Sequence, residues 1–238
     1  MHFFIDRQPC VCALARLLTG MSGNLQEQLY QRLRADLLAG RYLPGQRLKI
    51  RDLAAAWGTS PMPVRAALQR LAAEGALEGE AQRSLHVPQM DGERYRHLLQ
   101  VRLSLEGLAA EEGARRMDAD TLQQLQQASQ AMQAALDQRD VQAYLQHNSQ
   151  FHLGLYRAAG NPLLLRLIES LWLQVGPFFN QLFTAADLSL RLNEFHQQCL
   201  QAILAGDALA ARASIERDLS FCGQALLNLL ALDSQPAS

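Results

Sequence analysis

The chain has 238 residues, of which 49% are hydrophobic, and a formal net charge of −1. This length allows one large domain or two small ones, each with an apolar core. No apolar run reaches the roughly 18–20 residues that a membrane-spanning helix requires, so we expect no association with a membrane. A net charge so close to zero argues by itself against binding to nucleic acid.

The charge is, however, unevenly distributed along the chain. Residues 21–90 contain nine Lys or Arg and six Asp or Glu, which gives a net charge of +3. Residues 91–238 contain eleven Arg and sixteen Asp or Glu, which gives −5. A basic module followed by an acidic one is typical of a nucleic-acid-binding segment joined to a domain of another kind.

The first twenty residues differ from the rest of the chain. Met21 opens a segment that looks like a natural start, so we expect residues 1–20 to be a disordered or non-native extension. The cysteines outside this extension, Cys199 and Cys222, lie in expected helices, where reduced core thiols are favoured over a disulfide. We therefore expect a cytoplasmic protein.

Residues 25–39 begin the basic module with an amphipathic helix. Their leucines recur at every fourth position, and Gly40 follows as a C-cap. The Pro-Gly pair at 44–45 predicts a turn, and residues 49–57 predict a short helix.

Ser60 is the expected N-cap of a further helix, over residues 61–74, whose first turn accommodates two prolines. Two short strands around a polar turn follow, up to about residue 90. The order of helix, short helix, turn, helix and hairpin predicts a winged helix-turn-helix over residues 21–90. In such a domain the second helix of the pair enters the major groove of DNA.

Residues 91–232 show no strand signal and predict about six helices, an all-α bundle. Breaks fall near residues 117, 139, 160, 185 and 206, and three of them are followed by Asp residues that are good N-caps: Asp118, Asp140 and Asp207. The expected fold class is therefore mainly α, with a domain boundary near residues 88–91 and a short tail over 233–238.

Several segments resemble a known family of regulators. The Pro-Gly turn, "RDLA" at 51–54 and "S-x-x-PVR-x-AL-x-x-L-x-x-EG" at 60–75 are similar to the DNA-binding domain of GntR-type transcription regulators. "VRLSLEGLAAEEGARR" at 101–116, "N-x-x-x-H" followed by "AAGNPLL" at 148–164, and "EFHQQCLQAILAGDALAA" at 194–211 resemble the FCD ligand-binding domain of the FadR branch.

The resemblance implies a set of DNA contacts. It places Arg51 and Arg65 at the major groove, where a guanidinium bonds a guanine edge. Lys49 and Arg70 would contact phosphates, which position a protein on DNA without specifying sequence. Arg83 and Ser84 would reach a minor groove or the backbone. The full expected set is Lys49, Arg51, Ser60, Arg65, Arg70, Arg83 and Ser84. Pro61 replaces an Arg that is usual in the family, so one contact is missing.

The resemblance also implies a divalent metal site, which in FCD domains is held by an Asp-x-x-x-His pair and two further histidines. The corresponding residues here are Asn148, His152, His196 and Asp218. Two imidazoles, a carboxylate and an amide oxygen are suitable ligands for Zn, Mn or Ni. The alternative is that both histidines are hydrogen-bonded core residues in an empty pocket.

The resemblance also places Arg102 at the effector pocket, which we expect Trp172 and Gln174 to line. Arg102 would pair either with a carboxylate ligand or with Glu106, one helical turn away. Trp172 would either stack on a ligand or pack in the core.

These expectations together describe a homodimeric regulator that binds double-stranded operator DNA. Its operator affinity would be controlled by a small organic acid bound in the helical domain, through the divalent metal. The alternative function is a metal-dependent enzyme that uses His152, His196 and Asp218, although the chain shows no obvious nucleophile beside them.

Overall fold

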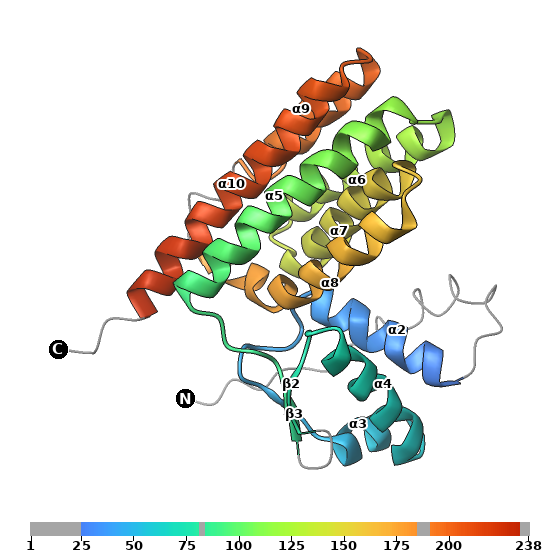
Figure 1. The fold of residues 1–238 in the computed structure, drawn as a ribbon, viewed down its shortest axis with the longest axis vertical. Coiled ribbons are helices and arrows are strands. Elements are labelled where there is room, and N and C mark those ends of the chain that lie inside the picture. Colours follow the sequence, from blue (N-terminus) through green and yellow to red (C-terminus); the bar gives the residue numbers. More distant parts are fainter. Residues whose placement is uncertain (1–24, 81–83, 185–190, 234–238) are drawn as a thin grey trace.

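The computed structural model describes residues 25–80, 84–184 and 191–233. They form two parts, a small domain with a three-stranded sheet and a larger helical bundle, and helix α2 (Leu25–Leu38) lies between them (Figure 1). The predicted extension over residues 1–20 lies outside the described residues, as does the tail beyond residue 233.

The small domain has the predicted order of elements, with one addition. Helices α3 (Ile50–Ala56) and α4 (Pro61–Ala73) precede the antiparallel hairpin of β2 (Glu78–Glu80) and β3 (Ser84–His86). The addition is β1 (Arg47–Leu48), which pairs antiparallel with β3 and gives the strand order β1-β3-β2. A strand of two residues beside a Pro-Gly turn carries too little periodicity to be seen in the sequence.

The core of the small domain forms where α4 packs on α2. Leu33 and Leu37 of the predicted leucine stripe are fully buried, as are Val64 and Leu71 of α4. Leu25 belongs to the same stripe but is 48% exposed, because it begins the helix and lies beyond the packed surface.

The described residues of the larger domain form a bundle of six α-helices, as predicted. They are α5 (Gly92–Arg115), α6 (Ala119–Asp137), α7 (Val141–Ala158), α8 (Pro162–Phe179), α9 (Glu194–Leu204) and α10 (Ala208–Asp233), with a 3₁₀ turn η1 (Asn180–Thr184) after α8. The side chains of Asp118, Asp140 and Asp207 cap α6, α7 and α10 by accepting backbone N–H bonds of 2.7, 3.0 and 2.9 Å. The predicted break near residue 185 lies outside the described residues.

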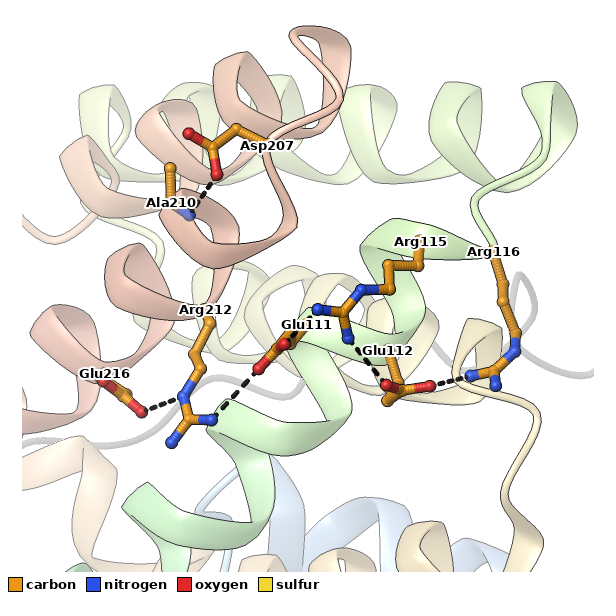
Figure 2. A network of polar contacts seen from close by, with 8 residues as sticks. All are labelled: Glu111, Glu112, Arg115, Arg116, Asp207, Ala210, Arg212 and Glu216. Carbon is orange, nitrogen blue, oxygen red and sulfur yellow. Dashed lines mark hydrogen bonds and ion pairs between the residues drawn. The ribbon is translucent and has the colours of Figure 1, made fainter.

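Helices α5 and α10 lie side by side along the bundle (Figure 1). A polar network joins them, in which Arg212 of α10 contacts Glu111 of α5 at 3.1 Å and Glu216 at 2.7 Å (Figure 2). Gly107 of α5 faces this network, since a Cβ atom there would lie 2.6 Å from Glu216 Oε1. The network therefore aligns the two helices that contribute a carboxylate each to the buried site described below.

Helix α8 connects the bundle to the small domain. Arg34 of α2 contacts Glu169 of α8 at 2.9 Å, and Ser170 Oγ donates to the carbonyl of Glu74 at the end of α4 (2.9 Å). Gly176 lies directly on the backbone of α2, because a Cβ atom there would be 2.7 Å from the carbonyl oxygen of Leu37. The two domains are thus in contact along α8.

Two further expectations concern the described residues. None of their helices has the length and hydropathy to cross a membrane. Cys199 and Cys222 are free thiols, as predicted.

Candidate DNA-binding face and metal centre

The exposed side of α3 and α4 carries most of the residues expected to contact DNA. Lys49, Arg51, Ser60 and Arg65 are all exposed. Arg51 and Arg65 form no ion pair with any described residue, whereas Lys49 lies 3.9 Å from Asp52 in a pair that is more than 70% exposed and hence weak. The charges of this face are therefore available to an external partner.

The start of α4 has two features that bear on DNA contact. Ser60 occupies the N-cap position, as predicted, but its side chain makes no capping hydrogen bond. Met62, two residues later, is 77% exposed and lies three residues before Arg65, so both side chains share one face of the helix. Sequence reasoning overlooked Met62, although the helical period from Arg65 identifies its face.

Arg70 differs from this group because its charge has partners within the domain. Its guanidinium contacts Glu27 of α2 at 2.7 Å and Glu74 at 3.3 Å, and it lies 3.6 Å from the centre of the Tyr30 ring. Arg70 therefore joins two helices of the domain. Its side chain is still 45% exposed, and its contact with a phosphate remains a prediction.

The hairpin residues are only partly described. Arg83 lies outside the described residues. Ser84 is the first residue of β3, and the structure does not describe its side chain.

Three of the four expected metal ligands converge in the bundle, each from a different helix. His152 of α7, His196 of α9 and Asp218 of α10 are all at least 95% buried, and their ligand atoms lie within 4.8 Å of one another. The Nε2 atoms of the two histidines are 2.9 Å apart, and His152 Nε2 is 3.3 Å from Asp218 Oδ2.

The fourth expected ligand, Asn148, lies one turn before His152 on α7. It lines the same cavity as His152 and Asp218, a space of about 30 Å³. A space of this size accommodates water molecules or an ion, and it is small for an organic acid.

Burial and the neighbouring charges set the protonation of the cluster. Burial lowers the pKa of His196 to about 4, so its imidazole is neutral near pH 7. Burial also opposes ionisation of Asp218, but the protonated forms of His196 and His152, together with Arg102, hold the pKa of this carboxyl below its usual value. A neutral imidazole and an ionised carboxylate are the forms that bind metal ions.

Glu106 of α5 is the centre of the polar contacts behind the cluster. It accepts hydrogen bonds from Arg102 Nε at 2.6 Å, from Tyr156 Oη at 2.8 Å and from Trp172 Nε1 at 2.9 Å. Tyr156 Oη also lies 2.9 Å from His152 Nδ1. Sequence reasoning missed Tyr156, although its position four residues after His152 places both side chains on one face of α7.

The residues expected to bind the effector are only partly brought together. Arg102 and Trp172 line the cavity, and Arg102 forms the buried pair with Glu106 that was one of its two expected contacts. Gln174 does not line this cavity; it lies beside Gly75 at the junction of the domains, in a shallow pocket with Asp91 and Arg94. It lies two positions after Trp172, so it faces another side of α8.

Comparison with known proteins identifies both domains. The family model "Bacterial regulatory proteins, gntR family" matches residues 25–87, and the FCD domain model matches residues 97–221. The transcriptional regulator McbR of Escherichia coli is 29% identical over 73% of this chain and 80% of its own. The transcriptional regulator BphR of Paraburkholderia xenovorans is 31% identical over 72% of this chain and 70% of its own.

A solved structure shows the same architecture. The structure of E. coli McbR/YncC has a TM-score of 0.79 and 26% sequence identity, and the match covers 90% of this chain and all of that one. Because both matched domains and these relatives belong to transcriptional regulators, the alternative of a metal-dependent enzyme is wrong. The chain belongs to the GntR family of bacterial transcriptional regulators, in the group that carries an FCD domain.

Proposed function

We propose that this regulator binds double-stranded operator DNA as a homodimer in the cytoplasm, and that a divalent metal ion and a small organic acid in the FCD domain control its operator affinity. The proposed control by a metal ion is supported by one observation: His152, His196 and Asp218 come together in a buried cluster. The observation that carries DNA binding is the exposed cationic side of α3 and α4.

Residues at the start of α4 would read the operator. The N-terminal residues of a recognition helix meet base edges in the major groove. Arg65 would bond a guanine, and Met62 would supply an apolar contact to a thymine methyl group. Arg51 and Lys49, at the start of α3, would contact the backbone or the neighbouring bases.

The donor set fits a metal ion. Two imidazole nitrogens and one carboxylate oxygen are ligands that Zn²⁺ binds. Asn148 lines the same cavity, and its side-chain amide oxygen would be a weaker fourth ligand. Two nitrogens bound to a tetrahedral ion are about 3.4 Å apart, so the present separation of 2.9 Å would have to widen slightly. A bound ion would supply a positive centre that attracts an anionic effector.

The organic acid requires a larger space than the cavity of about 30 Å³ offers. The side chains of Leu182 and Phe183 in η1 form part of its wall, and their displacement would open it. The small volume also favours a second candidate function, in which the metal ion itself is the signal.

Helix α8 would transmit the signal. Trp172 and Phe179 line the cavity from one side of α8, while Glu169 and Gly176 contact α2 from another. A ligand that changes the position of α8 would therefore change how the DNA-binding domain is held. The ligand must bind the two arrangements with different affinities, because otherwise it shifts no equilibrium.

The homodimer is supported by exposed apolar side chains on α5 and α8. Val101 and Leu108 of α5 are 46% and 42% exposed, and Leu163 and Leu167 of α8 are 59% and 49% exposed. The two helices pack on each other. A second copy would cover these side chains, and light scattering of the Leu167→Glu variant would then detect a monomer. A wild-type monomer would contradict the dimer.

The decisive experiment starts with selection of bound sequences from random duplexes. The selected operator is then titrated with protein that is metal-free or loaded with Zn²⁺, Mn²⁺ or Ni²⁺, each with and without a panel of carboxylic acids. A response to metal alone favours the second candidate, and a response that needs an acid favours the first. The proposal of DNA binding fails if no sequence binds better than random duplex at moderate salt.

The variant Asn148→Asp tests the metal site directly. Replacing the amide with a carboxylate should tighten Zn²⁺ binding, because a carboxylate is the stronger ligand. Unchanged affinity, measured by competition with a chromophoric chelator, would contradict a metal ion on this face of α7.

A further inference from the structure

The starting point is the charge state of Glu106. Its two oxygens accept from a guanidinium, an indole N–H and a phenol, and an indole or a guanidinium can only donate. Its side chain is fully buried beside the Arg102 cation. Glu106 is therefore an ionised acceptor with no proton to give.

This assignment determines the direction of the next hydrogen bond. The hydroxyl of Tyr156 has a single proton, which it donates to Glu106 Oε2 at 2.8 Å. Toward His152 Nδ1, at 2.9 Å, the same oxygen can then act only as an acceptor. The proton between these two atoms must therefore come from the imidazole.

We propose that Tyr156, oriented by Glu106, is a positioning residue that holds His152 with its proton on Nδ1 and leaves Nε2 as the atom that binds a cation. The inference rests on the metal site proposed above and extends it to residues outside the ligand set. In metal sites the second nitrogen of a ligating histidine commonly donates to a carboxylate, which fixes ring orientation and tautomer. Here a tyrosine stands between the histidine and the carboxylate.

The surroundings of Nε2 agree with this role. It faces the carboxylate of Asp218 at 3.3 Å and the Nε2 atom of His196 at 2.9 Å. A neutral His152 with its proton on Nδ1 has only a lone pair at Nε2. Nε2 and the Asp218 carboxylate are then both acceptors, and neither can donate a hydrogen bond to the other. Such a concentration of lone pairs in a buried space is stabilised by a cation or a proton between them.

The same contacts connect the metal site to the helix that holds the DNA-binding domain. Trp172 of α8 donates to the same oxygen of Glu106 as Tyr156 does. A movement of the His152 ring on metal binding would therefore be transmitted to α8 through the carboxylate of Glu106, which Tyr156 and Trp172 both contact.

The tautomer can be measured without any metal. Metal-free protein labelled with ¹⁵N-histidine is studied by two-bond ¹H–¹⁵N correlation at about pH 8, above the ordinary imidazole pKa of about 6.5. The His152 signals, assigned by their loss in His152→Gln, should show a protonated Nδ1 and an unprotonated Nε2. A proton found on Nε2 of the neutral ring would overturn the proposal.

Metal affinity gives the second measurement, with Tyr156→Phe compared with Tyr144→Phe. Each change removes one buried hydroxyl, but that of Tyr144 donates to the carbonyl of Leu192 at 3.0 Å instead of contacting His152. Zn²⁺ affinity should fall by about 10- to 100-fold in Tyr156→Phe and stay within about threefold in Tyr144→Phe. Thermal unfolding of both metal-free variants shows whether each remains folded.

The outcomes separate the two proposals. Equal Zn²⁺ affinity in wild type and Tyr156→Phe, or an equal loss in both variants, would contradict the positioning role. A wild-type protein that binds no Zn²⁺ would instead refute the proposed metal site. The tautomer spectrum decides the role of Tyr156 in either case.

Discussion

The charged side chains of the DNA-binding face and of the buried cluster differ in exposure and in pairing. On the face of α3 and α4, Arg51 and Arg65 are exposed and form no ion pair with a described residue. In the bundle, Arg102 is 2% exposed and contacts Glu106, which is fully buried. An exposed charge is screened by water and is free to meet a partner, whereas a buried charge is costly unless it is paired.

The comparison teaches that the two regions respond differently to mutation. Removal of a charge from the exposed face should change binding without changing stability. Removal of a charge from the cluster should change stability first, because its partner remains buried.

The largest effect is expected from Glu106→Gln. The change leaves Arg102 buried without its counter-ion, which typically costs about 3–5 kcal/mol of unfolding free energy. The control is Glu78→Gln, which breaks the partly exposed pair with Arg94 and should cost less than about 1 kcal/mol. Urea denaturation measures both, and similar losses in the two variants would remove the distinction between the regions.

The next effect concerns pH and His196. Its pKa is about 4 in the folded protein and 6.5 in the absence of burial, so the unfolded chain binds more protons between these values. Above about pH 6.5, His196 should therefore not reduce the unfolding free energy of the metal-free protein. It should fall by roughly 3 kcal/mol as the pH drops to about 4.

The matched variants for this test are His196→Gln and His97→Gln. The first should flatten the dependence on pH between about 4 and 6.5, while the second replaces an exposed imidazole and should leave it unchanged. An undiminished slope in His196→Gln would show that burial of this imidazole does not control stability in that range.

A smaller effect separates two arginines of the same helix. Arg65→Ala should weaken binding to a selected operator by about 1–3 kcal/mol, or roughly 5- to 150-fold, because a base contact is lost. Arg70→Ala should lower stability and weaken operator binding less than Arg65→Ala does, since its charge is shared with Glu27 and Glu74. Fluorescence anisotropy would contradict this assignment if Arg70→Ala lost as much affinity as Arg65→Ala.

The smallest effect concerns Met62. Replacing the contacted thymine by uracil removes one methyl group and should cost about 0.8 kcal/mol, or roughly fourfold in affinity. The same replacement should have no effect on Met62→Ala, because the apolar partner is already absent. A thymine–uracil difference that persists in Met62→Ala would assign the contact to another side chain.

Much of the fold could be predicted from the sequence because its signals are local. The leucine period of α2 and the caps Asp118, Asp140 and Asp207 each act within a few residues, and the structure has these elements. Strand β1 was missed because its partner β3 is almost 40 residues away, so no local pattern marks it.

The candidate site shows the same division. Resemblance to a family identified His152, His196 and Asp218 as one group, and the structure brings them together from three helices. It could not show that Arg70 faces α2, that Gln174 lies at the domain junction, or that the cavity is small. These properties depend on which side of each helix is covered by a neighbour.

The sequence by itself determined the class of the protein, its two domains and the residue types of the candidate site, because periodicity, caps and motifs are properties of neighbouring residues. Only the tertiary structure decided which charges are free and which are paired. It also decided that Tyr156 joins Glu106 to His152, because contacts between α5 and α7 bring together residues 50 positions apart. Burial and hydrogen-bond direction depend on such contacts, and no stretch of sequence contains them.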